Sequence, residues 1–522
     1  MDASKSPIID TGRAAATPSP APSPAQLPAI RSAGITLLGS VVGGGLIVSS
    51  EFLLARYLGV QSYGLYASGI TVARVGEALA VYGLPVAIFH FLPVYRHRSQ
   101  REETIGTVYA AGLLPLAIGC AFALIVWLLA PVLARHVFGA EAATPFIRVL
   151  AAAAPFMAAT EVLGAITRGY GHAKYYVIVK NLAAPVAFLA LLAAIVSSGA
   201  VAIRVPEALL AASAVACTAG VLAVVRVAGA DLWRVAPKFG FGTLYRYASG
   251  IMMNSLLYMV FAMTGAFAVA IFLGTDSVGI YRVCLQVVIP FDMVLLAFHA
   301  AMGPIYPVLL REKRGAELED AYAFALRWMA MLLLPIGIAL VWNRHDLLGL
   351  LGPGFTAGST AVTILAAGYA SATCFGTVAY LLMLGDHKAL EVRNALIAVA
   401  MNLVLCALLV PRLGLAGAAL ATAASFVLLN LRRIRQARTV FGLKTFRPYL
   451  MRLIAVSIVG GFGALALLEW LGIAQGRRAG DIALRLLLMA LLHISLLWAF
   501  GLDRHDKHVL WSLAGRLGAG RA

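Results

Sequence analysis

The chain has 522 residues, of which 61% are hydrophobic and only 12% are charged, and its formal net charge is +18. Its mean hydropathy of +0.89 lies far outside the range of soluble globular domains. The composition therefore excludes a soluble domain and indicates an integral membrane protein.

The N-terminal segment differs from everything that follows it. It contains AAATPSPAPSPAQLP, which is rich in Pro, Ala and Ser and cannot pack a core. Residues 1–29 are therefore predicted to form an unstructured tail. The first apolar run starts late and is long enough to span a bilayer, so we expect it to be retained as a helix rather than cleaved as a signal peptide.

Apolar runs of about 20 residues, the length that a helix needs to cross a bilayer core, follow one another from Ile35 to Leu502. Such long runs are typical of helices and not of barrel strands. The predicted fold class is therefore an all-α polytopic membrane protein with about fourteen helices. They are expected near residues 34–55, 64–94, 105–134, 145–167, 175–197, 207–228, 245–273, 278–310, 320–342, 357–384, 389–410, 414–431, 451–471 and 481–502.

The basic residues indicate the orientation of these helices. Most of the 41 Lys and Arg residues fall in loops on the same side as the N-terminus, so both termini are predicted to be cytoplasmic. On this distribution the positive charge reflects topology and contact with anionic lipid headgroups, and we expect no nucleic-acid partner.

Motifs for catalysis or metal binding are missing from the sequence. Its five cysteines lie inside apolar segments without a CxxC pair, and it contains neither HExxH nor GxxxxGK[ST]. We therefore expect a protein that is not an enzyme and that binds no metal or cofactor. H⁺ and Na⁺ are left open as coupling ions.

A long-range repeat divides the chain. RYLGVQSYGLYASG begins at Arg56, and the similar IFLGTDSVGIYRVC begins at Ile271. Further matches follow in order at nearly the same spacing, with GHAK at Gly171 against GDHK at Gly385. This series indicates internal duplication. Tyr66 and its counterpart Tyr281 are expected in an interfacial belt.

Each copy would hold six helices, so the two copies should be parallel repeats related by a pseudo-two-fold axis normal to the membrane. The predicted domains are residues 30–230 and 231–440 for the two six-helix lobes, 441–502 for two additional helices and 503–522 for a cytoplasmic tail. Such a plan places a cavity between two lobes and favours transport by alternating access.

Charged side chains inside the predicted helices are candidates for lining a cavity, because they are costly to bury in lipid. Arg74 and Glu77 share one face of a helix, and Asp292 occupies the position of Glu77 in the second copy. Arg74 could instead only neutralise Glu77, and Arg56 could extend to the interface. The candidate substrate-cavity residues are Arg74, Glu77, Arg282, Asp292, Arg56 and Glu51.

Three stretches give the chain a family resemblance: LGVQSYGLYA, RGYGHAKYYVIVKN and LMLGDHKALEVRNALIAVAMNLVLCALLVPRLGLAGAALAT. With the duplicated helices they resemble the polysaccharide-unit flippases of the multidrug/oligosaccharidyl-lipid/polysaccharide exporter superfamily, from residue 31 to about residue 500.

The resemblance implies a multi-pass protein of the bacterial cytoplasmic (inner) membrane. It implies a flippase that moves undecaprenyl-diphosphate-linked oligosaccharide units for O-antigen or exopolysaccharide synthesis, with membrane lipids, a polymerase and glycosyltransferases as partners. Two alternatives stay open. A cation-coupled multidrug exporter would typically have twelve helices, and a peptidoglycan-precursor flippase would have an arginine-rich first helix.

Overall fold

A computed structural model describes residues 27–198, 201–303, 305–385, 387–445, 448–472 and 479–502. Of the tails predicted at residues 1–29 and 503–522, residues 1–26 and 503–522 lie outside the described residues. Residues 27–29, predicted to be unstructured, form the start of a helix instead. In the described ranges every regular element is a helix and no strand occurs, which confirms the all-α fold class.

Twelve helices in the described residues are long and apolar enough to cross a membrane. Two candidate spans are far longer than one crossing needs, Gly34–His97 with 64 residues and Ala389–Phe441 with 53. Each contains a break in helical geometry, at Gly59 (φ 68°) and at Gly414 (φ 59°). Because a crossing takes about 20 residues, each of these two can hold two crossings, in agreement with the predicted number of about fourteen.

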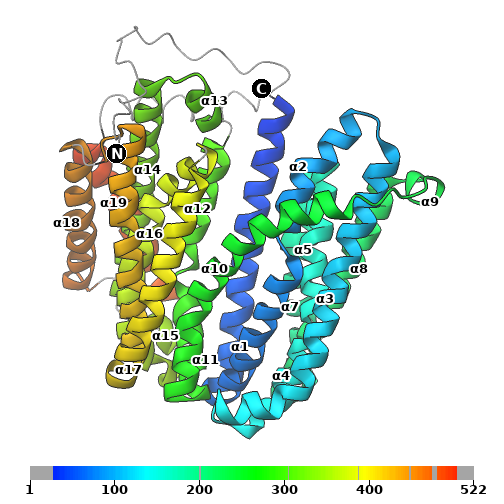
Figure 1. Cartoon of the computed structure of the whole chain (residues 1–522). Coiled ribbons are helices and arrows are strands. Elements are labelled where there is room, and N and C mark those ends of the chain that lie inside the picture. Colours follow the sequence, from blue (N-terminus) through cyan, green and yellow to red (C-terminus); the bar gives the residue numbers. More distant parts are fainter. Residues whose placement is uncertain are drawn as a thin grey trace, which may run out of the picture. The chain divides into compact units, whose positions relative to one another are not determined.

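The described residues form two compact units, which we describe separately. The N-terminal unit contains the described residues up to Ile289 together with 392–425. Its elements (Figure 1) are α1 (Leu27–Val81), α2 (Leu84–His97), α3 (Arg101–His136), η1 (Glu141–Ala143), α4 (Thr144–Ala151), α5 (Ala154–Gly169), α6 (Ala173–Tyr176), η2 (Val177–Ala183), α7 (Ala184–Ser198), α8 (Val201–Ala228), α9 (Asp231–Arg234), α10 (Phe241–Leu273), α11 (Thr275–Val287) and the middle of α17 (Lys388–Phe441).

The C-terminal unit contains the described residues from 290 to 391 and from Phe426 onward. Besides the two ends of α17, its elements are α12 (Ile289–Met302), α13 (Tyr306–Arg311), α14 (Gly315–Trp342), α15 (Arg344–Gly349), η3 (Pro353–Gly358), α16 (Ser359–Leu384), α18 (Pro448–Trp470), α19 (Ala479–Leu496) and η4 (Leu497–Gly501).

In the N-terminal unit α1 packs closely against α11 at two glycines. A Cβ atom on Gly64 would lie 2.4 Å from the carbonyl oxygen of Thr275, and one on Gly279 would lie 2.9 Å from the Cα atom of Gly64. Larger side chains would therefore separate the two helices. Gly64 and Gly279 occupy the same position in the two copies of the sequence repeat, so the contact joins equivalent positions.

Backbone geometry also recurs with the repeat. Gly59 has φ 68° and ψ 177°, and Gly274, its counterpart in the second copy, has φ 80° and ψ 179°. Ser99 and Lys313 correspond in the register that matches Gly171 with Gly385. Both adopt the left-handed region that non-glycine residues rarely enter, at φ 57° and 54°. The local structure thus follows the duplication seen in the sequence. The axis that would relate the two lobes, and their boundaries, remain predictions.

Within the C-terminal unit α14 packs against α16 and α18, and α18 packs against α19. Arg485 on α19 donates a hydrogen bond to the Oδ1 atom of Asn343 at 2.9 Å and forms an ion pair with Asp346 at 3.1 Å. Apolar side chains of α14, α18 and α19, including Ile338, form a buried cluster beside this contact. The last two helices are thereby joined to the rest of their unit.

Candidate functional site

A cavity of about 260 Å³ lies inside the N-terminal unit, between α1, α5, η2, α7 and α8. Most of its wall is apolar, as expected for a bundle of membrane-spanning helices. Charged and polar side chains nevertheless converge on it from four of the five elements. They are Ser50, Glu51, Tyr66, Arg74, Glu77, Thr160, Glu161, Lys180, Asn181 and Ser213.

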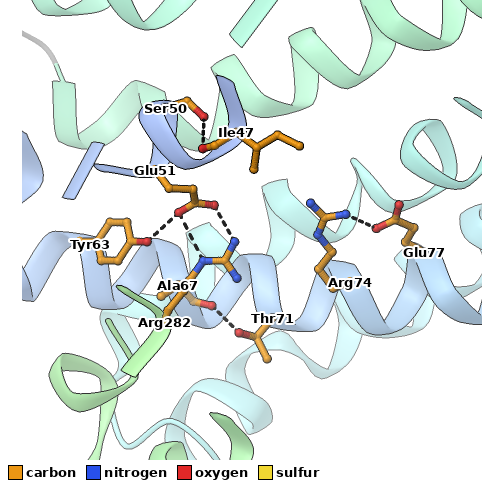
Figure 2. A network of polar contacts seen from close by, with 9 residues as sticks. All are labelled: Ile47, Ser50, Glu51, Tyr63, Ala67, Thr71, Arg74, Glu77 and Arg282. Atoms are coloured by element: carbon orange, nitrogen blue, oxygen red, sulfur yellow. Dashed lines mark hydrogen bonds and ion pairs between the residues drawn. The ribbon is translucent and has the colours of Figure 1, made fainter. Parts of the chain in front are cut away.

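The first charged pair of the cavity is Arg74 with Glu77, one helical turn apart on α1. The Nη1 atom of Arg74 donates to the Oε2 atom of Glu77 at 2.7 Å (Figure 2). The Arg74 side chain is 42% exposed and that of Glu77 is 19% exposed. A guanidinium carries five N–H donors, so Arg74 has donors left for an anion in the cavity.

The second pair is Lys180 with Glu161, whose Nζ and Oε1 atoms are 2.5 Å apart. Glu161 comes from α5, whereas Lys180 lies on η2 and also sits 5.6 Å from the ring centre of Tyr176. Both side chains line the cavity, and they are partly exposed, at 25% for Glu161 and 33% for Lys180. This contact, between residues 19 positions apart in the sequence, joins two helices at the cavity wall.

The segment that carries Lys180 is a seven-residue π-helix, and the sequence explains why it is wide. Pro185 lacks an N–H group, and a proline ring clashes with the carbonyl four residues earlier, here that of Asn181. A π-turn relieves such a conflict, and π-turns are frequent at functional sites. Gly43 on α1 allows η2 to approach, because a Cβ atom there would lie 2.4 Å from the backbone oxygen of Asn181.

The third pair joins the two sequence repeats. Arg282 on α11 donates to Glu51 on α1 through Nη2 at 2.6 Å and through Nε at 3.4 Å. The hydroxyl of Tyr63 donates to the same carboxylate at 2.6 Å (Figure 2). Side-chain exposures of only 16% for Arg282 and 8% for Glu51 show that this pair is much less accessible than Arg74.

The three pairs contain three cations and three carboxylates, so the charged groups of the site balance. Each charge has a partner within 2.7 Å, which reduces the cost of holding it between membrane-spanning helices. No group of His, Cys, Asp and Glu in the described ranges could hold a metal ion. The accessible donors of Arg74 make this cavity suited to an anionic or hydroxyl-rich headgroup.

The structure places the predicted site residues in different surroundings. Arg74, Glu77 and Glu51 line the cavity, and Arg282 contacts it through Glu51. Arg56 is exposed and is not part of the lining.

Asp292 is an exposed residue of the C-terminal unit and is not among the residues that line the cavity. Its expected role in a substrate cavity stays a prediction. Tyr66 and Tyr281 are only 2% and 1% exposed. Their expected place in an interfacial belt is therefore wrong, and Tyr66 lines the cavity instead.

Lys180 and Glu161 are not among the cavity residues predicted from the sequence, although the sequence contains a signal for this pair. The two residues carry opposite charges and fall inside neighbouring predicted spans. Opposite charges within membrane-spanning helices commonly pair. Nothing in the sequence specified that these two side chains would face the same cavity as Arg74.

Comparison with known families gives a match to the family described as polysaccharide biosynthesis protein, over residues 53–351. This match covers more than half of the chain and includes most residues of the three charged pairs. The chain belongs to the polysaccharide biosynthesis protein family. No curated protein matches it in sequence. The family membership confirms the resemblance that the motifs indicated.

Solved structures show the same fold at low sequence identity. A lipid II flippase MurJ in an inward closed conformation matches with a TM-score of 0.70, 13% identity and coverage of 89% of this chain and 98% of that chain. An inward-facing multidrug resistance MATE family transporter of the MOP superfamily matches with a TM-score of 0.62 and 13% identity, and the match covers 78% of this chain and 98% of that chain.

A MOP superfamily transporter from Pyrococcus furiosus matches with a TM-score of 0.57 and 15% identity, and the match covers 81% of this chain and 99% of that chain. At these identities the matches establish the polytopic membrane fold alone.

Proposed function

We propose that this protein is a flippase that moves undecaprenyl-diphosphate-linked oligosaccharide units from the inner to the outer face of the bacterial cytoplasmic membrane. The proposal rests chiefly on one observation: a member of a polysaccharide biosynthesis family holds a charge-lined cavity inside a membrane-spanning bundle. A diphosphate with attached sugars cannot cross hydrocarbon unaided, because its polar groups would lose their hydrogen bonds to water. A lined cavity replaces those bonds during alternating access.

Size indicates which part of the substrate the cavity would hold. Its volume of about 260 Å³ is below the ~300–1,000 Å³ of pockets that enclose a drug-sized ligand. A diphosphate with the adjoining sugar is therefore a better fit than a complete repeat unit. The prenyl chain would stay in the surrounding lipid, where its apolar surface costs nothing to keep.

Arg74 is the residue we propose to bind the diphosphate. Its guanidinium remains charged and can donate two parallel hydrogen bonds to phosphate oxygens while Nη1 stays with Glu77. Arg282 is a poorer ligand, because two of its nitrogen atoms already donate to Glu51 and its side chain is largely buried. We propose a structural role for that pair.

A substitution series at Arg74 tests this assignment. Arg74→Ala should abolish transfer of a fluorescent undecaprenyl-diphosphate disaccharide between the leaflets of proteoliposomes, and Arg74→Lys should retain part of it. Arg135→Ala is the matched control, because Arg135 forms an exposed ion pair with Glu141 outside the cavity. Normal transfer by a stably incorporated Arg74→Ala protein would contradict the site.

Deletion of the gene distinguishes the alternatives. Loss of surface polysaccharide, with lipid-linked units left facing the cytoplasm, supports the proposed substrate. Two other functions stay open as alternatives, because proteins of the same fold are named as a lipid II flippase and a multidrug resistance transporter. Arrest of peptidoglycan synthesis would indicate the first, and sensitivity to cationic dyes with normal polysaccharide would indicate the second.

The remaining parts of the proposal concern topology, energy and partners. Both termini should be cytoplasmic, and a periplasmic signal from a reporter fused after Ala522 would contradict that orientation. Transfer that stops when a pH gradient is collapsed would identify H⁺ as the coupling ion, whereas dependence on a sodium gradient would identify Na⁺. A polysaccharide polymerase and glycosyltransferases are the proposed partners, and crosslinking in cells can detect them.

A further inference from the structure

A second pocket, of about 490 Å³, lies at one end of the C-terminal unit. It is formed where α13 leads into α14 and where α16 and α17 end, and we call it the basic pocket. The topology expected from the loop charges places this end of the helices at the cytoplasmic face. The described residues that line it are Pro307, Leu309, Leu310, Arg311, Lys313, Gly315, Leu318, Leu384, Gly385, His387, Val440 and Phe441.

The charged residues of the basic pocket are all cations. Arg311 and Lys313 line it, and His387, whose ring packs edge-on against Phe441 at 5.8 Å, adds an imidazole. No acidic side chain is among its described lining residues. Two acids of the neighbouring loop, Glu312 and Glu317, both form ion pairs with Arg314. Among its described lining residues the pocket therefore carries positive charge only.

In the first sequence repeat an arginine bridges the corresponding positions. The Nη1 atom of Arg96 donates to the carbonyl oxygen of Tyr170 at 2.8 Å, and the guanidinium lies 4.6 Å from the centre of the Tyr170 ring. In the register that matches Gly171 with Gly385, the counterparts are Leu310 and Leu384. Neither side chain can donate a hydrogen bond, and both line the basic pocket. The second repeat thus lacks this bridge, and the pocket lies at the equivalent positions.

We propose that the basic pocket binds the phosphate headgroup of an anionic phospholipid. Arg311 and Lys313 supply the charge, since basic pockets between the ends of membrane-spanning helices suit such headgroups. Apolar side chains in the lining, among them Leu318 and Phe441, provide a surface for the glycerol and upper acyl region. This apolar part favours a lipid over free phosphate. The site is separate from the cavity of the proposed function.

Lipid binding to the full-length protein in neutral detergent tests the proposal. The probes are dioctanoyl phosphatidylglycerol, dioctanoyl phosphatidylcholine and inorganic phosphate, with bound lipid counted by native mass spectrometry. Phosphatidylglycerol should bind at least tenfold more tightly than the other two. Each of Arg311→Gln and Lys313→Asn should weaken it about fivefold. Asn suits the left-handed backbone of Lys313, so that variant should fold.

Two further variants separate a shaped pocket from general attraction between charges. Arg314→Gln is the matched control: it removes a cation from the same loop, but one already paired with acids and outside the lining, so affinity should change less than twofold. The double variant Leu310→Arg with Leu384→Tyr introduces the bridge of the first repeat. It adds positive charge yet should reduce phosphatidylglycerol binding at least fivefold by closing the pocket.

Three results would overturn the proposal. Equal affinity for inorganic phosphate and phosphatidylglycerol would exclude a lipid-specific site. An equal effect of Arg314→Gln and Arg311→Gln would show that only the net charge of the loop matters. Tighter phosphatidylglycerol binding by the double variant would show the same. Because the readout is lipid binding and not transport, failure here would leave the proposed flippase function unaffected.

Discussion

The pair of Glu51 and Arg282 allows a quantitative prediction, because it is the least accessible pair of the cavity region and joins the two sequence repeats. We expect Arg282→Met to destabilise the folded protein strongly. The substitution removes both hydrogen bonds that Arg282 donates to Glu51. Of the donors drawn in Figure 2, the Glu51 carboxylate then keeps the hydroxyl of Tyr63. A buried charge without a counter-ion is costly.

The magnitude follows from the two lost bonds. Hydrogen bonds to charged groups contribute about 1.5–3 kcal/mol each. The bond at 2.6 Å should lie at the upper end of that range, whereas the Nε contact at 3.4 Å is long and contributes less. The sum agrees with the roughly 3–5 kcal/mol measured when one partner of a buried ion pair is removed. We therefore expect a loss of about 3–5 kcal/mol in the free energy of unfolding.

Unfolding of the purified protein in mixed micelles, followed by tryptophan fluorescence, measures this loss. Arg314→Gln is the control, because its two ion pairs are exposed and exposed pairs contribute little. The double variant Glu51→Leu with Arg282→Met should regain most of the stability, since it leaves no unpaired charge. If Arg282→Met unfolds at the same denaturant concentration as Arg314→Gln, the pair does not have the structural role inferred here.

Two other predictions concern helix packing. Gly43→Val should lower the free energy of unfolding by about 1–3 kcal/mol, because the valine side chain would overlap the backbone of Asn181. Gly45→Val is the control and should unfold like the wild type, because a Cβ atom there meets open space. Equal losses of stability in the two variants would contradict the close packing at Gly43. Arg485→Gln should break the ion pair between α19 and Asp346, so limited proteolysis should cleave the chain faster near α18 and α19 while cleavage of the N-terminal unit stays unchanged. An unchanged cleavage rate near these two helices would show that apolar packing holds α19 without the ion pair.

Much of the fold could be predicted from the sequence because its determinants are local. A run of about 20 apolar residues satisfies its own backbone as a helix in lipid, so the number and approximate places of the spans follow from composition. Turn positions such as Gly59 and Gly274 are also local, since a left-handed φ favours glycine wherever it occurs. Duplication then supplied the correspondence between the two repeats without any knowledge of packing.

The candidate site could be predicted only in part. Charge inside a span identified Arg74, Glu77 and Glu51, because a buried charge is costly whatever its neighbours are. The sequence did not reveal that Lys180 and Glu161 face the same cavity. That arrangement depends on the π-turn before Pro185 and on the approach of η2 to Gly43, which are properties of packed helices.

The sequence by itself thus determined that the chain crosses a membrane many times, contains a duplication and carries charge inside its helices. Only the tertiary structure decided which charges pair, since a helical period fixes the face of a residue but not the helix it meets. Arg282 illustrates the difference. Its position in an apolar span marks it as costly to bury, but its partner Glu51 stands far earlier in the chain, in the other sequence repeat, and folding alone brings them together.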